Sequence, residues 1–91
     1  RPMSVQAVIE RWGPTGVQFV VKGLEKDASI TKEEREQGMD LVQRKDGGGF
    51  TGWLEALEKA HAGSQEVKTM RFMIDYLKGD TQHTSSRPSL L

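Results

Sequence analysis

The stretch that decides the fold is GFTGWLEAL, at residues 49–57. Its large apolar side chains recur at intervals of three and four residues, and they are Phe50, Trp53, Leu54 and Leu57. This spacing places all four on one face of an α-helix, which we expect to cover about residues 50–62. The stretch holds two of the chain's six aromatic residues. We therefore expect the core to be organised around this helix, with Trp12 as the other buried tryptophan.

Length and composition indicate a single domain without a strong electrostatic preference. The chain has 91 residues, with 13 basic and 13 acidic side chains and a formal net charge of zero. This balance argues against attraction of the whole chain to nucleic acid or to an anionic membrane. There is no cysteine, which excludes disulfides and thiolate metal sites. No apolar run approaches the ~20 residues that cross a bilayer, and no leader is visible, so we expect a cytoplasmic location.

Two helical segments are expected at the start of the chain. The first covers residues 4–12, where Ser4 can cap it and Gly13 and Pro14 end it. The second runs from about residue 15 to residue 26, with a stripe formed by Val17, Val20, Val21 and Leu24. Phe19 lies off this stripe. Residues 17–21 of this segment are rich in β-branched side chains and are also compatible with a buried strand, but the spacing that continues to Leu24 favours a helix.

A third helix is expected from Thr31 to residue 44 or 45. Thr31 and Glu34 have the spacing of a capping box, in which each side chain bonds the other residue's backbone amide. Gly38 lies in the middle of this segment and costs about 1 kcal/mol relative to alanine. The sequence leaves open whether one helix or two short ones form here. Residues 46–49, Asp-Gly-Gly-Gly, are expected to be a flexible link that stops this element.

The last helix is expected from Ser64 to about Gly79. One stripe holds Val67, Met70, Ile74 and Leu77, and a second apolar face holds Phe72, Met73 and Tyr76. This surplus of apolar residues indicates either ordinary core and rim or an interaction face. Residues 80–91 lack periodicity and are predicted to be a disordered tail. The predicted architecture is an all-α compact bundle of five or six short helices over residues 1–79, followed by the tail 80–91.

Motifs for catalysis or cofactor binding are not found. His61 is expected to be a partly exposed residue at a helix end, and His83 falls in the tail. No zinc-ligand spacing, nucleophile elbow or Cys/His pair is present, and the run 45–49 lacks the pattern of a phosphate-binding loop. We expect no cofactor, no metal site and no enzymatic activity.

Charge is balanced overall but is divided along the chain. Residues 25–40 carry six acids and three bases, whereas residues 59–78 carry four bases and two acids. Opposed charged faces can associate with copies of the chain or with a related domain. The expected partner-binding residues are Glu33, Glu34, Glu36 and Asp40 on the acidic face, and Lys59, Lys68 and Arg71 on the basic face.

Residues 49–57 also carry a family likeness. The pattern of Gly49, Phe50, Trp53, Leu54, Ala56 and Leu57 resembles the fifth-helix signature of caspase-recruitment domains, particularly those of cytoplasmic RNA-sensing helicases and their adaptor. Thr31, Glu33 and Glu34 resemble the start of the third helix in that family. The resemblance implies a six-helix Greek-key death fold, homotypic assembly through charged and apolar patches, and no enzymatic activity.

These observations predict a non-enzymatic protein–protein interaction module, of an adaptor or signalling type, that binds another protein domain through opposed charged faces. An alternative is a small helical nucleic-acid-binding or viral structural domain that uses the basic set Lys59, Lys68, Arg71 and Lys78. A third possibility is a regulatory or docking subunit whose apolar surplus lies against a larger enzyme.

Overall fold

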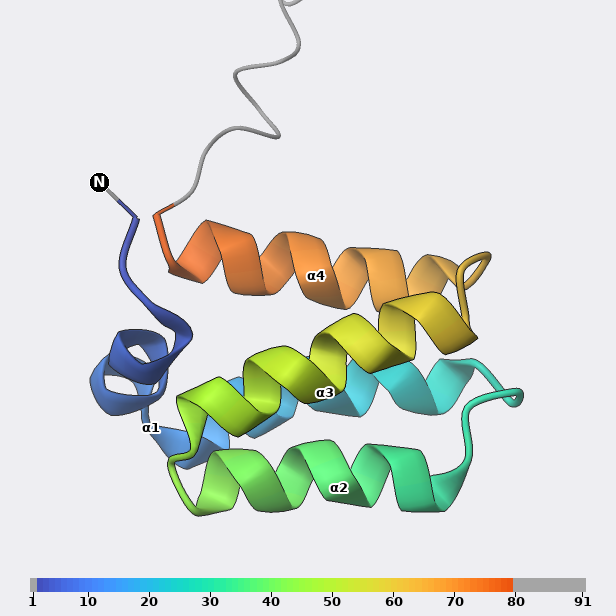
Figure 1. The fold of residues 1–91 in the computed structure, drawn as a ribbon, viewed down its shortest axis with the longest axis horizontal. Coiled ribbons are helices and arrows are strands. Elements are labelled where there is room, and N and C mark those ends of the chain that lie inside the picture. Colours follow the sequence, from blue (N-terminus) through green and yellow to red (C-terminus); the bar gives the residue numbers. More distant parts are fainter. Residues whose placement is uncertain (1, 80–91) are drawn as a thin grey trace, which may run out of the picture.

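Four α-helices and one 3₁₀ helix form the part of the chain that the computed structural model describes, residues 2–79 (Figure 1). In chain order they are α1 (Val5–Val21), the 3₁₀ helix η1 (Lys22–Lys26), α2 (Lys32–Gln43), α3 (Gly47–Ala60) and α4 (Gln65–Leu77). No strand occurs in this range, which confirms the all-α class, and the run 17–21 is helical. The predicted disordered tail, with His83, lies outside the described residues.

Each α-helix begins at a side chain that accepts a hydrogen bond from a backbone amide of the first turn. Ser4 accepts from Ala7, Asp46 from Gly49 and Ser64 from Val67. At α2 the predicted capping box is present: the Thr31 hydroxyl accepts from the Glu34 amide at 3.1 Å, and the Glu34 carboxylate accepts from the Thr31 amide at 2.8 Å. Such caps satisfy amides that have no partner inside the helix, so the helix starts follow directly from the sequence.

Helix α1 bends sharply at Gly13, which has a φ of 79°. This left-handed conformation is open to glycine but strained for other residues, and Pro14 suits the first turn of the arm that follows. The predicted break at Gly13 and Pro14 therefore takes the form of a kink that divides α1 into a first arm (residues 5–12) and a second arm (residues 14–21). The described chain has four α-helices, and the expected count of five or six is not confirmed.

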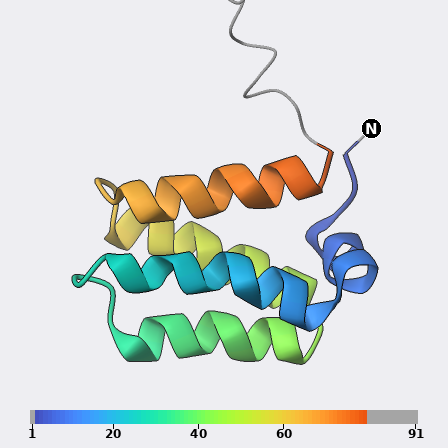
Figure 2. The same cartoon turned by 180° about the vertical axis from the view of Figure 1, so that it is seen from behind.

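The helices surround one core, with α4 and α2 at opposite edges of the bundle (Figure 1). The second arm of α1 continues into η1 and runs between these edges on one side, while α3 runs between them on the other (Figure 2). The first arm of α1 crosses one end of the bundle. The Met3 amide donates to the Lys78 carbonyl at 2.7 Å, so the start of α1 is joined to the end of α4.

The predicted apolar stripes form the core. The buried residues include all four stripe positions of residues 50–57 and all four of residues 17–24. Phe19, which lies off its stripe, is 75% exposed. Helical periodicity therefore predicted correctly which side of these two segments faces inward.

Trp53 packs against α2 at Gly38, where only a glycine leaves room for its ring. Its indole N–H donates to the Glu34 carbonyl at 2.9 Å, and its ring covers Gly38. A Cβ atom at Gly38 would lie 2.4 Å from two ring carbons of Trp53. Helix α2 is continuous through this residue, so Gly38 does not split the helix but lets α3 approach it.

The expectation of a flexible link at residues 46–49 is wrong. Asp46 caps α3, and the three glycines after it form the first turn of that helix. The Gly47 amide donates to Gln6 Oε1 at 2.8 Å, and a Cβ atom at Gly47 would lie 2.6 Å from the Gln6 backbone. A side-chain cap thus starts the helix despite the low helix propensity of glycine, and the glycines admit the first arm of α1.

The expectation that Trp12 is buried is also wrong, because half of its surface is exposed. Trp12 is the last residue before the kink at Gly13, and it lines a surface hollow together with residues of α4. Val5, Val8 and Ile9, which precede it on the same arm, are buried.

We predict that Gly38→Ala lowers the free energy of unfolding by about 1–3 kcal/mol, because the added methyl group overpacks against the buried Trp53 ring. Urea unfolding measures the change. Gly52→Ala is the matched control, since no atom lies within 4 Å of a Cβ there and α3 should gain about 0.5–1 kcal/mol. The loss of unfolding free energy caused by Gly38→Ala should be smaller in a Trp53→Leu background. Equal stability of Gly38→Ala and the wild type would contradict close packing of Trp53 on Gly38.

Candidate docking surface

The large apolar side chains that remain exposed in residues 2–79 belong to only two helices. They are Trp12 and Phe19 on α1, and Phe72, Met73 and Tyr76 on α4. The second arm of α1 and α4 run side by side in opposite directions on the face seen in Figure 2. Contiguous exposed apolar surface of this kind marks interaction sites in proteins. The predicted second face of the last helix is therefore solvent-facing, and α1 extends it.

Two hollows join along this pair of helices. One encloses about 400 Å³ and is lined by Trp12, Gly16, Val20, Phe72, Met73, Tyr76 and Leu77. It contains no charged side chain. The other encloses about 440 Å³ and lies nearer η1, where its walls include Phe19, Gly23 and Met70. Val20 and Met73 line both hollows, so the two hollows adjoin, and we name them together the α1–α4 trough.

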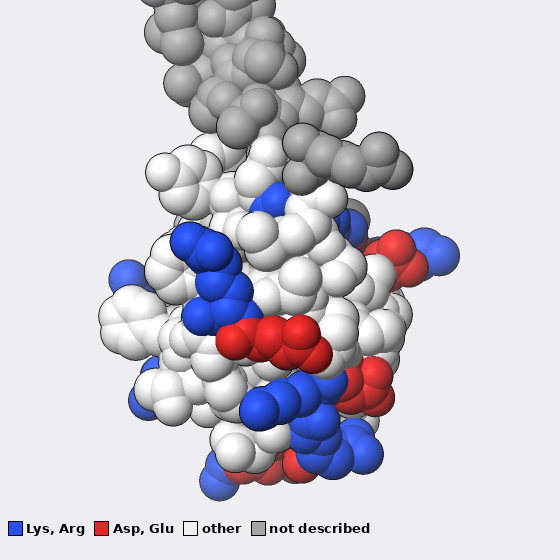
Figure 3. Space-filling view, turned by 90° about the vertical axis from the view of Figure 1, so that its left-hand side faces the viewer, with Lys and Arg blue, Asp and Glu red and all other residues white. Residues whose placement is uncertain are grey.

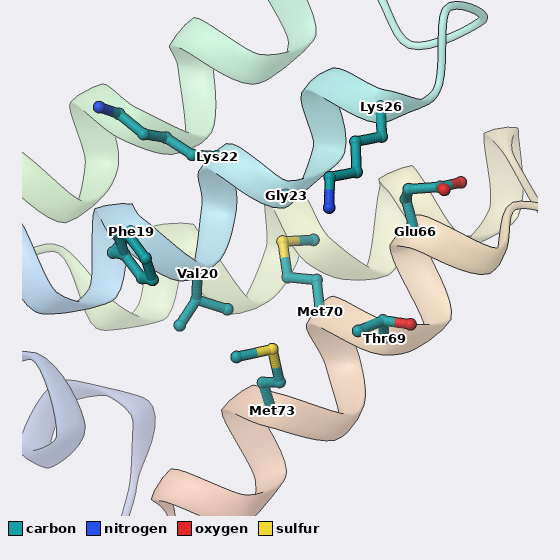
Figure 4. Close-up of a pocket in the computed structure, with 9 residues that line it drawn as sticks. All are labelled: Phe19, Val20, Lys22, Gly23, Lys26, Glu66, Thr69, Met70 and Met73. Carbon is teal, nitrogen blue, oxygen red and sulfur yellow. The ribbon is translucent and has the colours of Figure 1, made fainter.

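Figure 4 shows the hollow nearer η1. Met70 and Met73 project from α4 toward α1, and Val20 faces Met73 across the floor. Met70 is fully buried and anchors α4, whereas Met73 is 39% exposed and forms the floor that solvent reaches. Unbranched methionine side chains adapt their shape to what they contact. The floor is thus deformable, between walls fixed by the bundle.

Charged groups stand at both ends of the trough. Lys22, Lys26 and Glu66 line the end at η1. At the other end the Arg11 guanidinium lies 5.5 Å from the centre of the Trp12 ring, a cation–π contact. Sequence reasoning placed none of these residues in a site, because it had assigned Trp12 to the core.

The predicted acidic face is partly committed to the fold. Glu34 bonds Thr31 and lies 2.9 Å from His61 Nε2, while Glu36 pairs with Lys32 at 3.9 Å and Asp40 with Arg44 at 2.9 Å. Glu33 is exposed on α2. The four residues thus lie on one helix, α2, but Glu34 is engaged in joining α2 to His61 at the end of α3. Their role in partner binding stays a prediction.

The predicted basic face is likewise divided. Arg71 donates two hydrogen bonds to the Glu58 carboxylate, at 2.8 and 2.9 Å, and this pairing raises the pKa of the guanidinium. Arg71 and Lys78 also lie 3.7 and 3.9 Å from the buried carboxylate of Asp75. Lys59 and Lys68 are exposed. The end of the molecule that carries the first arm of α1 shows basic and acidic groups interspersed between uncharged areas (Figure 3).

A polar cluster connects the loop before α2 to the loop before α4. His61 ends α3, as predicted, and its Nε2 bonds the Glu34 carboxylate. That hydrogen bond, followed by the one from the Thr31 amide, holds the pKa of Glu34 below its ordinary value. Hydrogen bonds from Ser64 and Ser29 likewise lower the pKa of Asp27. Ser64 also caps α4, so these side chains are engaged in joining helix ends.

The described residues show neither a helix that could span a bilayer nor a group of three side chains arranged to hold a metal ion. The observed contacts of His61, Glu34 and Asp27 join helix ends. What the surface offers chemically is an apolar trough with Lys22, Lys26 and Glu66 at one end and Arg11 at the other.

We predict that Arg71→Glu lowers the free energy of unfolding by roughly 1–3 kcal/mol, because it sets a third carboxylate beside Glu58 and Asp75. Lys68→Glu, on the same helix but exposed, should change it by no more than about 0.5 kcal/mol. Chemical denaturation of both variants at low salt checks this. Equal stability of the two would show that the bonds of Arg71 contribute nothing.

We predict that the stability lost in Glu34→Gln depends on pH. Since the pKa of Glu34 is lowered in the fold, its contribution is fully present above the ordinary value of 4.5 and is lost as pH falls through the folded value. Measured from pH 7 to pH 3, the gap in unfolding free energy between wild type and variant should therefore hold above pH 4.5 and narrow below it. Glu33→Gln removes a neighbouring acid from the same first turn and should show no such closing gap; a gap constant across this range would refute the prediction.

No family model, curated protein or solved structure matches this chain.

Proposed function

We propose that this chain is a non-enzymatic protein-interaction module whose α1–α4 trough receives an amphipathic helix of a partner protein. The observation that carries the proposal is the concentration of every large exposed apolar side chain of residues 2–79 on two adjacent helices. A surface of this kind costs solubility unless it is covered in use. An adaptor or signalling role follows as the class of function that such a module serves.

The shape of the trough favours a helix as the bound element. Two antiparallel helices form its walls, and the floor between them is apolar along the part lined by Val20 and Met73. Amphipathic helices bind such grooves through side chains spaced three, four and seven residues apart. Phe19 and Tyr76, at 75% and 66% exposure, would flank the bound helix.

Opposed charged faces remain a secondary contribution in this proposal. Glu33 on α2 and Lys59 and Lys68 on α3 and α4 are exposed, whereas Glu34 and Arg71 are engaged inside the fold. Association with a related domain would then use the apolar trough for affinity and the exposed charges for orientation. A nucleic-acid role is less well supported, because Arg71 and Lys78 already neighbour acids.

A death-fold arrangement is the finer proposal for the architecture. With the two arms of α1 and η1 taken separately, the described chain contains six successive helical segments. This count supports the resemblance of residues 30–34 and 49–57 to caspase-recruitment domains. An experimental structure in which α1 is straight through Gly13 would remove that support.

The test of the trough uses an uncharged probe, an 18-residue helical peptide. It has leucine at positions 1, 4, 5 and 8 and at the later positions that continue this spacing, with glutamine and alanine elsewhere. We expect it to shift the fluorescence of the half-exposed Trp12, and to perturb amide resonances on α1 and α4. Met73→Glu should weaken binding at least about tenfold, because the bound helix would bury a carboxylate without a partner.

Ala62→Glu supplies the matched control, since Ala62 is exposed in the loop before α4 and does not line the trough. This variant should bind the uncharged peptide as the wild type does. Binding that survives Met73→Glu, or resonance changes centred on α2 and α3, would overturn the proposed function.

A further inference from the structure

The trough is apolar along its floor but basic at its rim. Of the residues that line it, Lys22 and Lys26 are basic and Glu66 is acidic. Arg11, stacked on Trp12, adds a positive charge at the far end. The groups that a bound helix would meet beside its apolar stripe are therefore predominantly positive.

The two lysines, Lys22 and Lys26, make no polar contact through their side chains within the described part of the fold. Neither forms an ion pair or side-chain hydrogen bond within residues 2–79, whereas Lys32 and Lys78 each pair with an acid of their own helix. Both lie at the C-terminal end of the α1–η1 segment, where positive charge offsets the helix dipole. The helix dipole accounts for basic residues at this end but not for the direction of the Lys26 side chain, which extends toward α4 over Met70. Lys22 lies at the edge of the same hollow, and its side chain points away from α4 (Figure 4).

We propose that the helix received by the trough is acidic: its apolar stripe fills the hollow between Trp12 and Met73, and acidic side chains beside the stripe reach Lys26 and Lys22. This inference rests on the proposed function. From Pro14, just past the kink, to Lys26 at the end of η1, the second arm and the 3₁₀ helix together extend roughly 20 Å. A partner helix of about four turns therefore spans both the apolar end and the lysines.

A second copy of the chain fits this surface less well. At the roughly 200 Å² that a large aromatic side chain can bury, the five exposed side chains offer about 500 Å². A standard interface needs ~800 Å² from each partner. A two-fold contact through this face would also place Lys22 and Lys26 opposite their copies or near Arg11, and Glu66 is the one acid of the lining that the copy would add.

The test compares three peptides that share the leucine stripe of the uncharged probe and carry glutamate, glutamine or lysine at the flanking positions. Titration calorimetry at 50 mM salt should give the order glutamate, glutamine, lysine from tightest to weakest. We expect the first and last to differ by about tenfold, the size that two exposed ion pairs supply. The difference should shrink at 0.5 M salt, because exposed charges are screened.

The double variant Lys22→Glu, Lys26→Glu should reverse the order of the charged peptides, so that the lysine peptide binds more tightly than the glutamate peptide. The matched control is Lys59→Glu, Lys68→Glu, which changes net charge equally at exposed sites outside the trough lining. It should keep the wild-type order.

Each remaining outcome decides between the two proposals. Equal binding of all three peptides to the trough would reject an acidic partner and leave the proposed function standing. Reversal by the control variant as well would show a net-charge effect and also reject it. Binding of none of the peptides, or a dimer of the full chain at 50 µM that Met73→Glu dissociates, would overturn the acidic helix as occupant together with the docking of a partner helix.

Discussion

The contact between Trp53 and α2 is the constraint on which the rest of the structure depends. Its ring needs the space above Gly38, and its N–H needs the Glu34 carbonyl, so α3 can lie against α2 in only one register. The Glu34 carboxylate is hydrogen-bonded to both Thr31 and His61, which joins the start of α2 to the end of α3. A tilted contact between Phe50 and Trp53, 5.1 Å between ring centres, completes this interior.

Placing these aromatic rings inside determines what is left outside. The buried rings Phe50 and Trp53 both come from α3, whereas the contacts of α1 with α4 on the other side depend on smaller side chains such as Val20 and Met70. Aliphatic packing there leaves a shallow trough, and the larger side chains of both helices stand at its edges. The apolar surface of the α1–α4 trough is thus a consequence of how the core is filled on the opposite side.

Periodicity predicted the helices and their buried stripes because a helix face is a local property of the chain. The exposure of Trp12 was missed because spacing cannot give the direction of an arm beyond the positive φ of Gly13. The glycines at 47–49 were read as a link, since their close approach to Gln6 is a contact between distant segments. Only the α4 wall of the trough was predicted, from the surplus of apolar residues on that helix. The local sequence did not indicate that Lys26 and Phe19 line a shared surface with α4.

In this molecule some charged side chains hold the fold together, while several large apolar side chains are exposed to water. The charged residues that sequence reasoning assigned to a partner, Glu34 and Arg71, make hydrogen bonds that join helices, and partial burial makes them costly to leave unpaired. Side chains such as Phe19 and Tyr76, which lie off the buried stripes of their helices, remain in water. Because water opposes the exposure of apolar surface more than that of charge, the surface with most to gain from a partner is the trough, and the charges at its rim then act on which partner is accepted.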